Sequence, residues 1–225
     1  MPSILQRRRI LASGSPVWTP MQLSPLIWFN AATLAVANGN PVDTWTNDGT
    51  AGAAGNASAI GTARPTMDST GINGAPAVLF DAVDDAMSFS HASTTAFTVW
   101  FIYKANNASG RSRVYSDLSN QLVGFYDGNR SMFTARSFLT GAASATGTHC
   151  FIAQCSASGR SLRVNGDTVS DATAAGTLSG LAGLGDVSGF IKGCIGELGV
   201  MNRVLTAGEL NSLTQYLTVK SGVAA

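Results

Sequence analysis

Charged side chains are scarce in this chain of 225 residues. Only 12% of the residues are Asp, Glu, Lys or Arg, and the formal net charge at pH 7 is +1. A balance so close to neutral produces no overall field that would attract nucleic acid or an anionic membrane surface. Apolar runs long enough to cross a bilayer are missing as well. We therefore expect neither nucleic-acid binding nor membrane insertion.

Residues that commonly carry catalysis are also few. The chain has only two glutamates, Glu197 and Glu209, and two histidines, His91 and His149. A lone carboxylate is more often a structural hydrogen-bond acceptor than half of a catalytic pair. Neither histidine has a serine and a carboxylate that the sequence places beside it. We expect a protein that is not an enzyme.

The three cysteines, Cys150, Cys155 and Cys194, are an odd number, which argues against a disulfide framework. Cys150 and Cys155 are five residues apart on one apparent strand, so their side chains point to opposite faces and cannot easily pair. His149 beside Cys150 lacks the donor spacing of a metal site. We expect three buried thiols in a reducing compartment, and no metal or other cofactor.

Residues 1–22 differ from the rest of the chain. Three prolines interrupt them, and each restricts the preceding residue to extended geometry. No adequate apolar segment follows the three arginines, so we expect no secretion signal and assembly in the cytoplasm. The segment is interpreted either as an extended arm that binds a partner surface or as a terminus that frays or folds back. The residues expected to contact the partner are Arg7, Arg8, Arg9, Ile10, Leu11 and Trp18.

The closing stretch carries the clearest local signals. Residues 193–201 alternate between apolar residues and Gly or Glu, which predicts a half-buried strand with close neighbours at its glycines. Thr206 and Glu209 have the spacing of a capping box, and Gly222 is a typical C-terminal stop. The sequence therefore predicts a helix between Thr206 and Gly222. Its inner face is formed by Leu210, Leu213 and Leu217, with Tyr216 beside them.

A series of strands is predicted in the middle of the chain. Residues 97–104 are almost continuously apolar, which indicates a central strand buried on both faces. Asp127-Gly128 predicts a tight hairpin turn, and Asn165-Gly166 predicts another. Further strands are expected over residues 113–117, 121–126, 131–136, 148–155 and 181–187.

Several motifs resemble the concanavalin A-like lectin/glucanase superfamily in its laminin-G-like form. GCIGELGVMNRVLTAGEL at 193–210 is similar to the closing strand and helix of such domains, and INGAPAVLFD at 72–81 is similar to their I-N-G-x-P-A-V-x-F-D-G signature, with Ala82 in place of the last glycine. The resemblance implies an all-β fold. We expect an antiparallel two-sheet jelly-roll sandwich over residues 23–225, preceded by the extended arm of residues 1–22 and closed by one short helix.

The same fold carries lectins, hydrolases and structural modules. Glucanases of this superfamily use an E-x-D-x-x-E strand, but glycine and asparagine stand at positions 199 and 202 after Glu197, so the motif is absent. Lectins stack sugar rings on exposed aromatic side chains. Candidates for such a face are Trp45, Tyr115, Phe125, Tyr126 and Phe138. Most aromatic side chains of a sandwich are core residues, so each of these taken singly is interpreted as structural, and the sequence selects no binding site.

The acidic cluster of Asp81, Asp84 and Asp85 has two interpretations. Laminin-G-like domains can hold Ca²⁺ with carboxylates at a loop rim. Alternatively, the aspartates accept backbone N–H bonds within a turn. We favour the turn.

Single-domain proteins of similar layout, rich in Ala, Gly, Ser and Thr, occur among the structural proteins of tailed bacteriophages. We therefore predict a virion surface component, either a capsid decoration protein or a tail or fibre part. The arm would bind other virion proteins, and the jelly roll would face host-surface glycans; a homo-oligomer is also considered. The alternatives are a lectin-like protein outside a virion and, more distantly, a divergent glycoside hydrolase. Removing residues 1–22 is expected to leave the fold intact.

Overall fold

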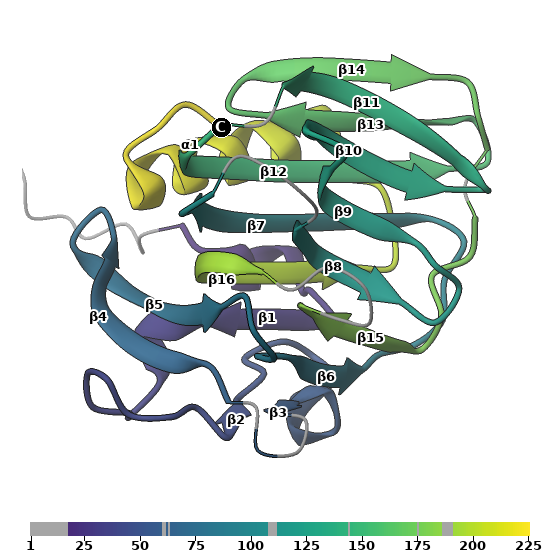
Figure 1. Ribbon diagram of the computed structural model, residues 1–225. Helices are drawn as coiled ribbons and strands as arrows, with labels where there is room; N and C mark the ends of the chain where they lie inside the picture. Colours follow the sequence, from purple (N-terminus) through teal and green to yellow (C-terminus); the bar gives the residue numbers. More distant parts are fainter. Residues whose placement is uncertain are drawn as a thin grey trace, which may run out of the picture.

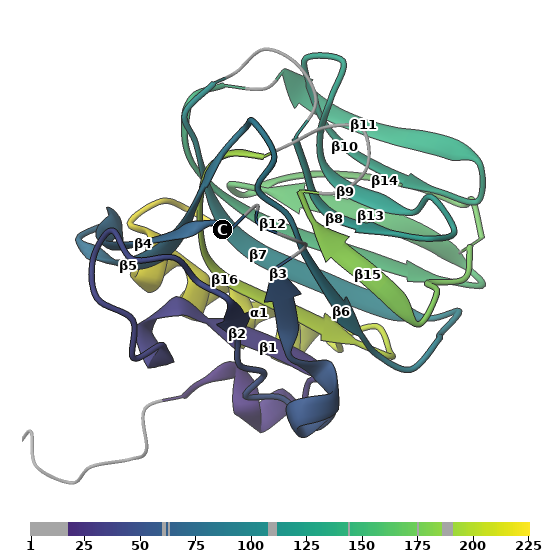
Figure 2. The same ribbon diagram turned by 60° about the horizontal axis from the view of Figure 1, so that its bottom comes forward.

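The computed structural model describes residues 18–59, 62, 64–107, 112–143, 145–174, 176–185 and 191–225. Two antiparallel sheets pack face to face, and one C-terminal helix lies against the outer side of one of them (Figure 1 and Figure 2). The predicted all-β sandwich with a short closing helix is confirmed. No helix in the described part of the chain is long and apolar enough to span a membrane.

Sheet I contains the long central strands and has the order β14-β13-β12-β7-β16-β5-β4, with β1 also paired to β16. Its strands are β1 (Ile27–Asn30), β4 (Thr66–Ile72), β5 (Ala75–Asp81), β7 (Phe97–Ala105), β12 (Gly147–Ser156), β13 (Gly159–Val164), β14 (Asp167–Asp171) and β16 (Lys192–Met201). All of its pairings are antiparallel.

Sheet II has the order β11-β10-β9-β8-β15-β6-β3-β2. Its strands are β2 (Thr44–Trp45), β3 (Ala57–Ala59), β6 (Met87–Ser90), β8 (Ser112–Asp117), β9 (Leu122–Tyr126), β10 (Asn129–Thr134), β11 (Ser137–Ala143) and β15 (Leu181–Leu184). Short 3₁₀ helices occupy Pro20–Leu23, Ala31–Thr33 and Gly52–Gly55, and the single α-helix of the described residues is α1 (Ala207–Ser221).

Strand β7 is buried on both faces, as predicted. Phe101 and Tyr103 point into the core between the sheets, whereas Trp100 and Ile102 belong to a second apolar cluster beneath α1. This two-sided burial explains why the strand has no polar alternation. Gly199 on the neighbouring β16 lies against the Trp100 indole so closely that a Cβ atom there would overlap the ring. The close approach predicted for the glycines of this strand is therefore confirmed.

Helix α1 begins and ends where the sequence predicts. The Thr206 hydroxyl accepts a hydrogen bond from the Glu209 N–H (3.3 Å), and the Glu209 carboxylate accepts one from the Thr206 N–H (2.9 Å). Gly222 ends the helix in the left-handed conformation with φ 75°. These local bonds satisfy terminal backbone groups, and Leu213 and Leu217 then hold the helix on sheet I.

The cysteines are free thiols, as expected. Cys150 lies under α1 and Cys155 in the core between the sheets, so the two side chains of β12 do point to opposite faces. Burial raises the pKa of all three thiols to about 11. They are therefore protonated and unreactive at neutral pH.

Several strand boundaries differ from prediction, most of them by one residue. The strand expected at 131–136 runs from Asn129 to Thr134, because Ala135 and Arg136 adopt positive φ (52° and 64°) and turn the chain into β11. Strand β11 was not anticipated, and β14 was anticipated only through the hairpin turn at Asn165-Gly166 that precedes it. Both lie at sheet edges and expose many of their side chains, so their apolar alternation is weak.

Candidate functional site

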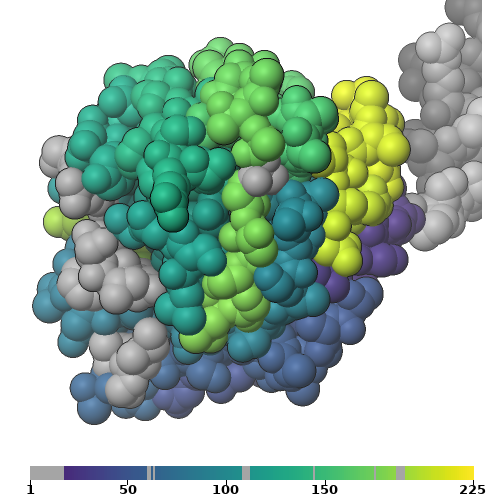
Figure 3. Space-filling view, turned by 90° about the vertical axis from the view of Figure 1, so that its right-hand side faces the viewer, coloured from purple at the N-terminus to yellow at the C-terminus, as the bar shows by residue number. Residues whose placement is uncertain are grey.

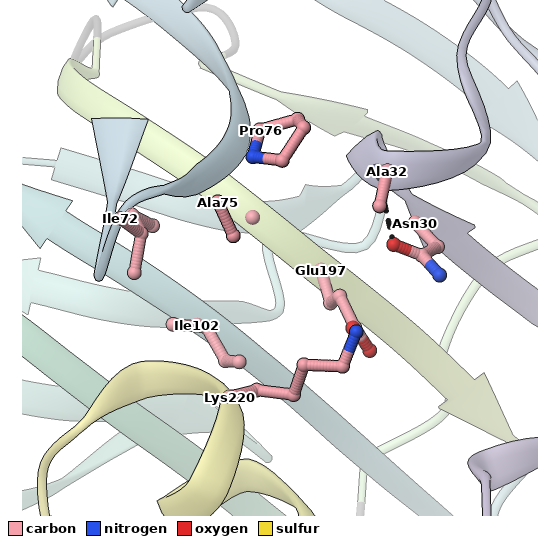
Figure 4. Close-up of a pocket in the computed structure, with 9 residues that line it drawn as sticks. Asn30, Ala32, Ile72, Ala75, Pro76, Ile102, Glu197 and Lys220 are labelled. Atoms are coloured by element: carbon pink, nitrogen blue, oxygen red, sulfur yellow. Dashed lines mark hydrogen bonds and ion pairs between the residues drawn. The ribbon is translucent and has the colours of Figure 1, made fainter. Parts of the chain in front are cut away.

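Among the described carboxylates near α1, that of Glu197 is the most deeply buried. It projects from β16 on the outer side of sheet I, and its side chain is only 4% exposed. Its Oε1 accepts a hydrogen bond from the Tyr216 hydroxyl (2.7 Å) and lies 3.5 Å from Lys220 Nζ, while Oε2 accepts one from Trp28 Nε1 (3.1 Å). Figure 4 shows the Glu197 carboxylate and the Lys220 ammonium meeting at one side of a small pocket.

The pKa of Glu197 is raised, mainly by burial, although the bonds from Tyr216, Lys220 and Trp28 oppose the shift. The pocket beside it has a volume of about 20 Å³. Such a space holds about one water molecule, so no sugar ring fits against the carboxylate. Both carboxylate oxygens are occupied by contacts that join β1, β16 and α1, and Glu197 acts as a structural link between these elements.

The other predicted chemical groups also have structural partners. Glu209 forms an ion pair with Arg203 (2.6 Å), whose hydrogen bonds lower the pKa of Glu209 to about 2. His91 bonds to the Ala92 carbonyl (2.8 Å) and the Tyr115 hydroxyl (3.1 Å), and burial lowers its pKa. His149 bonds to the Ala145 carbonyl (2.8 Å), and its pKa is lowered in the same way. Both histidines are therefore neutral at pH 7.

The aspartate cluster forms the turn that the sequence analysis favoured. Asp85 accepts a hydrogen bond from the Asp81 N–H (2.8 Å), and Asp81 accepts one from the Val83 N–H (2.7 Å). Ala82, which replaces the glycine of the family signature, takes a positive φ of 71°. Carboxylate oxygens of Asp81, Asp84 and Asp85 lie within 4.8 Å of one another.

Three of the aromatic residues proposed for a sugar-binding face are core residues. Trp45 and Tyr115 are fully buried, and Phe125 is 2% exposed. Their strands pair in registers that turn these side chains toward the opposite sheet, so the structural interpretation holds for these three residues. The other two candidates, Tyr126 and Phe138, lie on the outer side of sheet II and stack with ring centroids 4.5 Å apart.

Phe133, which sequence reasoning missed, completes this group. It pairs across the strands with Phe138, at a ring-centroid distance of 4.7 Å. We call Tyr126, Phe133 and Phe138 the aromatic platform. Its members alternate with the core residues of β9, β10 and β11, and this alternation in the sequence is the signal that would have identified Phe133.

The platform has polar neighbours on the same outer face. Asn129 is the cross-strand partner of Tyr126, and Thr140 is the partner of Ser131 in the next row. Phe138 is 39% exposed, an unusual value for a large apolar ring. Tyr126 and Phe133 are half-buried beside it. An exposed ring beside amide and hydroxyl groups forms a surface that can stack on an apolar face and bond to hydroxyls at its edge.

Arg160 fixes the hairpin that carries the platform. This β13 side chain is 2% exposed, and its guanidinium donates to the carbonyls of Thr134 (3.2 Å), Ser137 (2.8 Å) and Phe138 (3.0 Å). It also pairs with Asp171 on β14 (2.9 Å), and this contact lowers the pKa of Asp171 to about 2. One buried side chain of sheet I therefore holds the β10–β11 turn of sheet II in place.

The predicted partner-binding residues are only partly described. Arg7, Arg8, Arg9, Ile10 and Leu11 lie outside the described residues. Trp18 packs against Tyr216 of α1 in an edge-to-face contact of 5.8 Å, and Pro20 and Leu23 are buried. The last residues of the predicted arm therefore lie on the outer side of sheet I, beside the helix.

Comparison with known proteins finds similarity only at the level of structure. No family model matches the sequence, and no curated protein matches it. Domain 4 of AbnA, a GH43 extracellular arabinanase from Geobacillus stearothermophilus in complex with arabinotriose, has a TM-score of 0.59 and 15% identity, covering 84% of this chain and 98% of that chain.

Two further structures are similar over most of this chain. Trypanosoma rangeli sialidase in complex with sialic acid has a TM-score of 0.58 and 13% identity over 92% of this chain, which spans 34% of the sialidase. The botulinum neurotoxin type G receptor binding domain has a TM-score of 0.56 and 10% identity over 85% of this chain and 51% of that chain. At such identities the likeness establishes the class of fold, a jelly-roll β-sandwich, and no more.

Proposed function

We propose that this protein is a non-enzymatic β-sandwich that binds glycans through its aromatic platform and is displayed from a virion surface by its N-terminal arm. The observation that carries the glycan proposal is the platform on the outer side of sheet II, with Phe138 exposed and Tyr126 and Phe133 half-buried beside it. Pyranose and furanose rings present C–H groups on one face and hydroxyls at the edge. The aromatic rings of the platform can stack on the C–H groups, and the neighbouring Asn129 and Thr140 can bond to the hydroxyls.

The neighbours support this ligand class without deciding it. The arabinanase domain that covers 84% of this chain was seen with a bound arabinotriose. A non-catalytic role is supported by the two glutamates, because Glu197 is locked beneath α1 and Glu209 serves as the helix cap. A divergent glycosidase would need another pair of carboxylates flanking a substrate.

The arrangement of the two outer faces suits display. The platform lies on the outer side of sheet II, whereas the N-terminal segment and α1 lie on the outer side of sheet I. In Figure 3 the teal-green hairpins of β9–β11 and the yellow helix with the neighbouring purple segment occupy different sides of the molecule. A partner bound at the arm would therefore leave the platform open to a glycan. A lectin-like protein outside a virion is the alternative, and it would use the same platform.

The glycan proposal is tested by screening the intact protein on an array of neutral and acidic oligosaccharides, followed by titration calorimetry with the best ligand. Stacking of one ring contributes about 1 kcal/mol, so Phe138→Ala should weaken binding about fivefold or more. Val83→Ala is the matched control, because Val83 is 69% exposed on another turn. Loss of binding in the control as well, or no binding by the intact protein, contradicts the proposal.

The display proposal has a separate test. The full chain and a chain lacking residues 1–17 are mixed with source particles that lack this protein and are sedimented through a cushion. Co-sedimentation of the full chain alone supports an arm anchor at the virion surface. If neither chain sediments with the particles, the virion role is wrong, and the glycan screen still decides the lectin alternative.

A further inference from the structure

The outer face of α1 carries an apolar hollow that the described residues leave open. Its volume is about 300 Å³, and it is lined by Trp18, Ser212, Gln215, Tyr216 and Val219. Val219 is 78% exposed, although the opposite face of the same helix is well buried. Trp18 and Tyr216 both line the hollow and contact each other edge to face, so the hollow lies directly beside Trp18.

The chain that precedes Trp18 is long enough to fill this hollow. Seventeen residues lie before it, among them the adjacent apolar residues Ile10 and Leu11. The seven residues from Trp18 back to Leu11 span at most about 23 Å when extended. Helix positions 212 to 219 are only about 10 Å apart along the axis. Leu11 can therefore reach every lining residue without displacing Trp18.

The charges around the hollow favour the apolar pair over the arginine cluster as its occupant. Lys220 is the nearest charged neighbour, with its ammonium 5.6 Å from the Tyr216 ring. Glu197 is already bonded to Lys220 and Tyr216, and Glu209 to Arg203. The described part of this face thus has no unpaired carboxylate that would hold a guanidinium.

We propose that the hollow is a docking site for residues 10–17 of the same chain, with Ile10 and Leu11 packed against Trp18, Tyr216 and Val219. Arg7, Arg8 and Arg9 directly precede the docked segment in the sequence. Residues 10–17 are then bound to the domain itself, and only the preceding arginines are left to contact an acidic partner surface. This proposal does not depend on glycan binding.

Tryptophan fluorescence provides the test, because Trp18 is the accessible tryptophan of the chain. Trp28 is 7% exposed, and Trp45 and Trp100 are fully buried. Acrylamide quenching of the intact protein therefore reports the surroundings of Trp18. We expect the quenching constant to rise at least twofold in a chain lacking residues 1–16, and to a similar extent in an Ile10→Asp/Leu11→Asp variant of the full chain.

Replacing the three arginines by serine is the matched control and should leave quenching unchanged. Val219→Asp, on the other wall of the hollow, should raise quenching as the Leu11 change does, and melting curves confirm that each variant is folded. Equal quenching of the intact and shortened chains overturns the proposal. Quenching that rises on dilution, together with a dimer in sedimentation, would assign the hollow to the arm of a second copy and would also overturn it.

Discussion

The contacts of Glu197 allow a sharp prediction about how α1 is held. Glu197→Ala would remove the acceptor of the Trp28 indole N–H and of the Tyr216 hydroxyl at a site that is almost fully buried. Each unsatisfied buried donor costs about 1–3 kcal/mol, and breaking a buried charge pair costs about 3–5 kcal/mol. Lys220 is 38% exposed and can turn to water, so the total loss should be about 3–4 kcal/mol.

Glu197→Gln should behave very differently. Its carbonyl can accept from Trp28, and its amide can donate to the oxygen of the Tyr216 hydroxyl, so both contacts keep a partner. The substitution also removes a carboxylate whose charged form is penalised by burial. We expect a loss of about 1 kcal/mol or less at pH 7. In a protein of this size, the alanine variant should melt about 10 °C below the wild type and the glutamine variant within about 3 °C.

The pH dependence has a defined sign. Because the folded-state pKa of Glu197 is raised above 4.5, folding favours its protonated form, and its contribution to stability falls as the pH rises from 4.5 through the folded pKa. In urea unfolding, the free energy of unfolding of the wild type relative to that of the glutamine variant should be higher at pH 4.5 than at pH 7.5. The account would be refuted if the glutamine variant were as unstable as the alanine variant, or if the relative stability of the wild type rose with pH instead of falling.

Three further predictions concern the packing around α1. Gly199→Ala should cost about 1–3 kcal/mol in urea unfolding, because its methyl group would overlap the Trp100 ring; an unchanged midpoint contradicts the close approach. Thr206→Ala should cost about 1 kcal/mol through loss of the helix cap, and Thr206→Ser should restore most of it. Deleting residues 1–17 should lower the melting temperature slightly, because it removes the docked Ile10 and Leu11. Deleting residues 1–22 also removes Trp18 and buried Pro20 and should lower it by several degrees more; equal melting of both chains would show that these further contacts contribute nothing.

Strands with strong local signals were predictable from the sequence. The apolar run of β7, the capping box of α1 and the Asp127-Gly128 turn between β9 and β10 each depend on interactions within a few residues. Edge strands were not predictable in the same way. The side chains of β14 are mostly exposed, so burial imposes little pattern on its residues.

The aromatic residues show where sequence patterns stop being informative. Phe125 and Tyr126 are adjacent, yet the first is core and the second belongs to the platform. Alternation separates them once a strand is known, but it does not say which of the two faces is covered. That choice is made when sheet I packs against sheet II, and it moved Trp45 and Tyr115 into the core.

The sequence by itself determined the elements whose stabilising contacts are local: the cap of α1, the hairpin turns and the alternating strands. Tertiary structure alone decided the partners of the buried polar groups. The Trp28 indole N–H donates to Glu197, which lies 169 residues later in the chain. Arg160 donates to carbonyls of residues 22 to 26 positions before it, on the other sheet. Such contacts exist only after the sheets have paired and packed, since no short stretch of chain contains both members.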